Sequence, residues 1–135
     1  MIPKLQDFLS LVGRILLASL FLPSGMSKLT SFANTVSYIK IVGMPMPEVA
    51  AVIALTVEIL GGFALIAGLG TRFAAIVLAV FTLVASFYFH NYWAVLADQQ
   101  FVMQLLFFKN IAVVGGLLTV ATWGPGKWSL DALRN

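Results

Sequence analysis

The fold is decided by residues 48–70, EVAAVIALTVEILGGFALIAGLG, a nearly continuous apolar run with one carboxylate, Glu58, near its centre. A helix needs about 20 apolar residues to cross the hydrocarbon layer of a bilayer, and this run is long enough. A charged side chain at that depth costs about 2.5–3.5 kcal/mol on insertion scales, so it must face protein or water, or stay protonated. What Glu58 contacts is therefore the central question about function.

The composition places the whole chain in a membrane. Hydrophobic residues make up 61% and charged residues 10% of the sequence, against about 25% charged residues in soluble domains. We predict an all-α integral membrane protein, a single domain over residues 1–135, built as a bundle of four transmembrane helices. A short amphipathic helix at the membrane interface is expected between spans 1 and 2, within residues 31–47. The predicted spans cover about residues 8–27, 48–69, 72–91 and 101–122.

The sequence lacks the residues that several classes of chemistry require. The chain has no cysteine and one histidine, which excludes disulfides, thiolate nucleophiles and iron–sulfur ligation. No nucleotide, flavin or zinc-hydrolase motif is present. The net charge of +3 lies at helix ends and loops, which indicates topology rather than nucleic-acid binding. No catalytic residue and no metal ligand is assigned.

An intramembrane polar cluster is expected around Glu58. Counted from the outer ends of their helices, Glu58 lies about 15 Å deep and Lys109 about 12 Å deep. We therefore expect these two side chains to form an ion pair, because an unpaired charge costs far more than a paired one in a low dielectric. Arg14 and Asn110 are expected to complete its hydrogen bonding.

Two interpretations of this cluster remain open. Ala54, Glu58 and Gly62 share one helix face, and small residues there let helices pack closely in lipid. The charges then either hold the helices in register or form a functional site, and the residues alone favour neither. His90 stands beside Tyr92 and Trp93 at the outer end of span 3, where an interfacial histidine satisfied by water is the simpler interpretation and a proton acceptor the alternative.

Five segments in order resemble the DoxX family of small bacterial membrane proteins. They are GRILLASLFLPSGMSKL (13–29), EILGGFALIAGLGTR (58–72), FYFHNYW (87–93), FFKNIAVVGG (107–116) and GPGKWSLD (124–131). The resemblance covers essentially the whole chain. The family-motif positions that it carries over, besides the four cluster residues, are Gly25, Lys28, Gly61, Gly62, Arg72, His90 and Gly116.

The resemblance implies a multi-pass protein of the bacterial inner membrane, embedded in the lipid bilayer. It further implies an accessory or redox-linked subunit that interacts with quinone or quinol, or with a membrane oxidoreductase partner, and quinone is the one candidate cofactor. A non-catalytic scaffold or assembly subunit, a homo-oligomer and a small transporter are the alternatives. No nucleic-acid partner is expected, and the sequence does not indicate an enzyme acting on its own.

The charges near the spans predict the topology. With four spans, Lys4, Arg72, Lys127 and Arg134 lie on one side and Lys28 and Lys40 on the other, so both termini should be cytoplasmic by the positive-inside rule. Single cysteines introduced at Asn135 and at Thr35 should react with a membrane-impermeant reagent from opposite sides. Reaction of both from one side would contradict four spans, and the absence of native cysteine keeps the background low.

Overall fold

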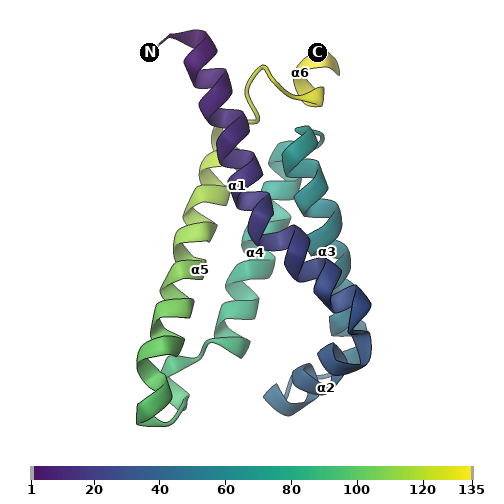
Figure 1. The fold of residues 1–135 in the computed structure, drawn as a ribbon, viewed down its shortest axis with the longest axis vertical. Coiled ribbons are helices and arrows are strands. Elements are labelled where there is room, and N and C mark those ends of the chain that lie inside the picture. The colour runs from purple at the N-terminus through teal and green to yellow at the C-terminus, as the bar shows by residue number, and fades with distance from the viewer. Residues whose placement is uncertain (1, 135) are drawn as a thin grey trace.

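The computed structural model describes residues 2–134, and within them the regular structure is entirely helical. Four helices in this range, α1, α3, α4 and α5, are long and apolar enough to cross a membrane, which confirms the predicted all-α fold (Figure 1). The elements are α1 (Pro3–Thr30), α2 (Phe32–Val42), α3 (Pro47–Ala67), α4 (Thr71–Phe89), the 3₁₀ turn η1 (Tyr92–Ala94), α5 (Ala97–Trp123) and α6 (Leu130–Arg134).

Helix α1 extends beyond the predicted first span at both ends. Its 28 residues continue through Pro23 and through the Ser24–Leu29 segment to Thr30, whereas the sequence suggested an end near residue 27. Because the helix does not stop at Pro23, Lys28 lies one turn after Ser24 on the same face. This extension brings Lys28 into the packed part of the bundle.

The predicted short helix between the first two spans is α2, and it covers the end of the bundle away from the termini (Figure 1). Ile39 is buried there, and the ring of Tyr38 stacks on Phe89 of α4 with 5.4 Å between centroids. Gly43 ends the helix at φ 93°, a left-handed conformation that glycine adopts without strain. Its N–H group returns to the carbonyls of Ile39 and Lys40.

The four spans pack mainly as two pairs. Helix α1 crosses α3 and α5 runs beside α4, while α3 also contacts α4 and joins the pairs (Figure 1). Helices α1 and α5 touch over a short length only. The chain termini lie at one end of the bundle, and α2 and η1 lie at the other.

Two adjacent glycines place α3 between its neighbours. A Cβ atom on Gly61 would lie 2.8 Å from Cγ of Leu78 on α4, and one on Gly62 would lie 2.6 Å from Cγ of Leu22 on α1. Consecutive residues are about 100° apart around a helix, so the pair opens two different faces. On α1, a Cβ atom on Gly25 would lie 2.7 Å from Cγ1 of Ile59. These positions let the backbones approach closely, which is the main source of helix association in lipid.

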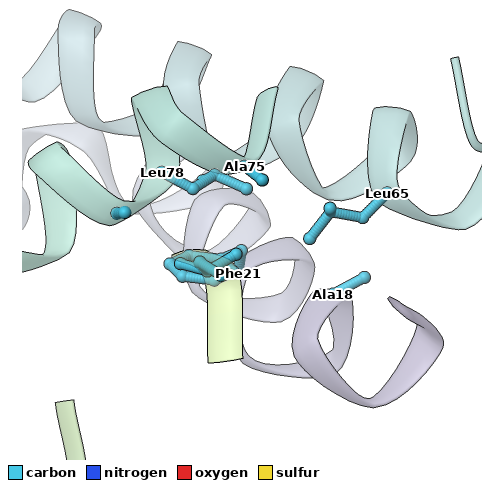
Figure 2. Packing of buried hydrophobic residues seen from close by; sticks show 7 residues of the cluster. Ala18, Phe21, Leu65, Ala75 and Leu78 are labelled. Carbon is cyan, nitrogen blue, oxygen red and sulfur yellow. The ribbon is translucent and has the colours of Figure 1, made fainter. Parts of the chain in front are cut away.

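The apolar centre joins α1, α3 and α4. Figure 2 shows Ala18 and Phe21 of α1 facing Leu65 of α3 and the α4 pair Ala75 and Leu78. All five are buried, and Phe21 is 2% exposed. The polar groups described below lie on either side of this centre along the bundle axis.

Candidate functional site

Glu58 faces the interior between α1 and α4. On α3, Gly61 faces α4 and Gly62 faces α1. Because successive residues are rotated by about 100° around a helix, the side chain of Glu58 points between these two directions. The residue is 4% exposed. The carboxylate is therefore enclosed by protein rather than lipid.

Lys28 of α1 is the ionic partner of Glu58. Its Nζ lies 2.7 Å from Oε1 of Glu58 and also donates a 2.7 Å hydrogen bond to Oγ of Ser24, one turn earlier. The Lys28 side chain keeps 27% of its surface exposed, against 6% for Glu58. Lys28 thus neutralises a buried carboxylate from the partly open side of the α1–α3 crossing. Gly25 makes this contact close, since a Cβ there would lie 3.1 Å from Cβ of Glu58.

One polar atom at the level of this ion pair lacks a hydrogen-bond partner. Oγ1 of buried Thr82 on α4 has none in residues 2–134, whereas Oε1 of Glu58 is held by Lys28 at 2.7 Å. Gly61 faces Leu78, and α3 and α4 are antiparallel, so Glu58 and Thr82 lie at about the same level of the bundle.

The chemistry available to this site is limited. It holds one carboxylate, one ammonium group and hydroxyls, with no second acid and no nucleophile paired to a base. No cluster of three or more potential metal ligands exists among the described residues. The site can hold charge and hydrogen-bond a small polar group, which is binding or structural chemistry.

The expected pair between Glu58 and Lys109 is wrong. Lys109 is exposed on α5, and within residues 2–134 no carboxylate lies in ion-pair distance of it. Helix α5 packs on α4 and not along α3, with Phe107 in edge contact with Phe87 at 5.4 Å. The sequence analysis compared how deep each residue lies in the membrane, and Glu58 and Lys109 lie at similar depths. Their helices, α3 and α5, are not neighbours. Asn110 is half-buried on α5 and likewise lies apart from Glu58.

Arg14 also lies elsewhere, at the end of the bundle that carries the termini. Its Nη1 donates to the carbonyls of Leu65 (2.7 Å) and Ile66 (3.2 Å), and its Nη2 donates to the carbonyl of Trp128 (2.6 Å). Both α3 carbonyls belong to the last turn of the helix, where carbonyl groups have no hydrogen-bond donor within the helix. A cation there also matches the negative end of the helix dipole. Arg14 is 1% exposed and joins α1, α3 and the chain after α5.

The C-terminal tail, residues 124–134, is hydrogen-bonded across the same end of the bundle. Oγ of Ser10 donates to the carbonyl of Pro125 (2.9 Å), and the Lys127 N–H group donates to Asp7 (3.2 Å). The N–H of Asp131 donates to the carbonyl of Gly68 (2.8 Å). Oγ of Ser129 accepts the N–H of Ala132 and so caps the start of α6.

The side chain of Asp131 caps α4. Its two carboxylate oxygens accept the N–H groups of Gly70 (2.8 Å) and Thr71 (2.9 Å) at the first turn of that helix. Partial desolvation by itself would raise the pKa of Asp131, but the backbone donors of Thr71 and Gly70 outweigh it and lower that pKa below its ordinary value. A carboxylate at a helix N-terminus is also favoured by the helix dipole.

The remaining family-motif positions are distributed over the bundle. Arg72 donates to the carbonyl of Thr122 (3.0 Å) and so ties α4 to the end of α5. The N–H of His90 bonds the carbonyl of Ser86 at the end of α4, and its ring Nδ1 is buried without a partner in residues 2–134. Gly116 lies on the α5 face toward α1, where a Cβ would be 3.5 Å from Leu17. The predicted cluster thus separates into an interior ion pair and a polar cap at the terminal end.

Two functional contacts were missed by the sequence analysis. The first is the ion pair of Lys28 with Glu58, because the sequence analysis placed Lys28 just beyond the end of span 1. Two signals pointed to it: Lys28 lies four residues after Ser24, and spans 1 and 2 are consecutive in the chain. The sequence analysis assigned no contact to the tail residues Trp128 and Asp131. Their contacts depend on the tail folding back, for which the sequence holds no local signal.

Comparison with known proteins agrees with this architecture. Residues 9–91 match the DoxX family. The Escherichia coli (strain K12) inner membrane protein YqjF is 40% identical over 98% of this chain and 96% of its own length, and inner membrane protein YphA of the same organism is 34% identical over 93% and 90%. A Surfeit locus protein 4 homolog of Schizosaccharomyces pombe is 29% identical over 93% of this chain but 37% of its own length. No solved structure matches.

The ion pair predicts strong coupling between Glu58 and Lys28. Glu58→Gln and Lys28→Met should each lower stability in detergent, because each strands one charge, and the double variant should lose less than the sum, with a coupling of about 0.5–3 kcal/mol. Thermal unfolding of the purified protein measures all four forms. Lys109→Met is the matched control, and its effect should add to that of Glu58→Gln within about 0.5 kcal/mol. Additive losses for Glu58 and Lys28 would contradict the pair.

The cap on α4 predicts a dependence on pH. Because the folded pKa of Asp131 is lowered, its stabilisation is complete above the ordinary value of 3.8 and is lost as the pH falls through the folded value. At pH 7, Asp131→Asn should cost about 0.3–1 kcal/mol, because the amide keeps an acceptor oxygen but loses the charge at the helix N-terminus, and the difference from the native protein should shrink below about pH 4. Thermal unfolding across this range tests it, with Asp98→Asn as a control of smaller effect. A difference that persists at low pH would contradict the capping role.

Proposed function

Because the chain belongs to the DoxX family of small inner-membrane proteins, we propose that it is an accessory subunit of a membrane complex whose partner binds helix α5. The ionisable groups within the bundle are engaged in structural contacts, Glu58 with Lys28 and Arg14 with backbone carbonyls. What remains to act on other molecules is the outer surface of the spans.

The observation that carries this proposal is Lys109. It lies about 18 Å from the first residue of α5, Ala97, at about 1.5 Å per residue, and within residues 2–134 no carboxylate pairs with it. A charge exposed within a span is costly, and such residues are normally paired or face a polar interior. A carboxylate on a neighbouring transmembrane helix would supply the missing partner.

The surface around Lys109 suits a helix partner. Only Phe107 and Leu117 are buried along the 27 residues of α5. Ala112 and Gly115 are exposed within two turns of Lys109 and are small. Small residues allow close backbone approach between membrane helices, where packing and polar contacts drive association. The partner expected from the family resemblance is a membrane oxidoreductase, and a second copy of this chain is the alternative.

A quinone-linked role is the second candidate. It is favoured by the unpartnered hydroxyl of Thr82 and by Lys28, since a quinone carbonyl could accept from the hydroxyl or the ammonium group. Quinone in a lipid extract of the gently purified protein would support this role. A hydrophobic carbodiimide should then modify Glu58, and an added short-chain quinone should protect it. Complete inertness of Glu58, with the unfolded chain as reactive control, would oppose it.

The orientation that we propose places the end with both termini in the cytoplasm. That end carries Lys4, Arg72, Lys127 and Arg134, and cationic residues near span ends favour the cytoplasmic side. The polar cap formed by Arg14 and the C-terminal tail would then face the cytoplasm.

Site-specific crosslinking tests the accessory-subunit proposal. A photoreactive residue at Ala112, beside Lys109, should crosslink a specific membrane protein in intact cells, whereas one at exposed Val80 of α4 should give only diffuse products. Lys109→Met should reduce the Ala112 crosslink at least tenfold, and Lys109→Arg should retain it because the charge is kept. Lys40→Met on α2 is the control for loss of a surface charge. A crosslink that is absent, or that is unaffected by Lys109→Met, would overturn the proposal.

A further inference from the structure

A lateral groove of about 560 Å³ runs between α1 and α5 in the half of the bundle nearer the termini. Its lining is mostly apolar. On α1 it includes Leu9, Leu16 and Leu20, and on α5 it includes Val113, Val120 and Trp123. This groove is separate from the Glu58–Lys28 pair and from Lys109.

Two of the residues that line the groove are glycines, Gly13 on α1 and Gly116 on α5. A Cβ atom on Gly13 would meet nothing within 4 Å, and one on Gly116 would meet only Leu17 at 3.5 Å. Helices α1 and α5 touch over a short length only, and they diverge toward the end of the bundle away from the termini (Figure 1). An apolar space of this kind does not hold water well. Hydrocarbon, by contrast, would restore the dispersion contacts that the lining side chains otherwise lack.

The groove is elongated along the helix axes. From Val113 to Gly124 it extends about 16 Å. A flexible acyl chain can follow such a slot, and the charge at its mouth decides in favour of a lipid as the occupant.

The mouth of the groove is positively charged. Gly124 lies at its end, and a Cβ there would be 3.1 Å from the guanidinium group of Arg72. Lys127 follows in the tail, with its backbone N–H on Asp7 and its side chain exposed. Trp123 is 79% exposed at the same level, as is typical of residues at the headgroup layer. Three cations, Arg14, Arg72 and Lys127, stand against the two carboxylates Asp7 and Asp131 at this end of the groove, which leaves a net positive charge where a lipid phosphate would lie.

We infer that this groove binds an anionic phospholipid, with one acyl chain between α1 and α5 and the phosphate at Arg72 and Lys127. Arg72 already uses Nη1 on the carbonyl of Thr122, and its other donors can reach an anion. Basic residues near the membrane surface attract anionic lipid. The site therefore combines an apolar slot with charge complementarity at its mouth. It does not depend on the partner proposed for α5.

Native mass spectrometry of the detergent-purified chain tests the site. After delipidation, addition of phosphatidylglycerol should give one retained lipid, held at least tenfold better than phosphatidylcholine of the same chain length. Gly13→Leu should abolish retention by filling the groove, since its Cβ has free space. Gly115→Leu is the matched control, because Gly115 also has free space but lies outside the groove. Thermal unfolding checks that both variants are folded.

The headgroup is tested separately. Lys127→Gln leaves every side-chain contact of the tail intact and should reduce the preference for phosphatidylglycerol several-fold, and Arg72→Gln should reduce it further. Equal retention of the two lipids, or retention unchanged by Gly13→Leu, would overturn the inference. Displacement of the lipid by an equimolar short-chain quinone would assign the groove to quinone instead. A dimer lost on Gly13→Leu would assign it to a second copy, and either result also overturns the lipid site.

Discussion

The structure depends on one constraint, the high cost of a charge enclosed in the bundle without a partner. Glu58 satisfies it through Lys28 at 2.7 Å, and Arg14 satisfies it through the last carbonyls of α3 and the tail. Both contacts run between α1 and α3 on opposite sides of the apolar centre around Phe21. Stranding either charge would be costly in low dielectric, so the two contacts fix both the pairing and the axial register of these helices.

Close packing makes this arrangement possible. Gly25, Gly61 and Gly62 remove side chains where α3 meets α1 and α4, so α3 can hold contacts on two faces at once. In lipid there is no hydrophobic effect between helices, and packing of small residues is the main attraction. The glycines therefore stabilise the α1–α3 crossing, and this crossing also encloses the ion pair. They explain why Glu58 faces protein at a depth where lipid would otherwise surround it.

The other half of the molecule is packed less completely. Helix α5 packs on α4 and buries few of its own residues, which leaves Lys109 exposed and an apolar groove between α5 and α1. Polar groups are thus satisfied internally on α1 and α3, while α5 offers surfaces for other molecules. This asymmetry favours a role in binding partners and lipid over chemistry within the bundle.

The sequence by itself determined the membrane class, the four spans, the helix between the first two of them and the family, because hydropathy, length and turn residues are local properties. It also identified Glu58 and Arg14 as the charges to be explained. It could not determine their partners. Depth along a helix can be counted from the sequence, and that count led to Lys109. Which helices are neighbours, and which face each presents, depends on packing at Gly25, Gly61 and Gly62. Only the tertiary structure therefore decided that Glu58 meets Lys28 and that the tail closes over Arg14, since both contacts join segments far apart in the chain.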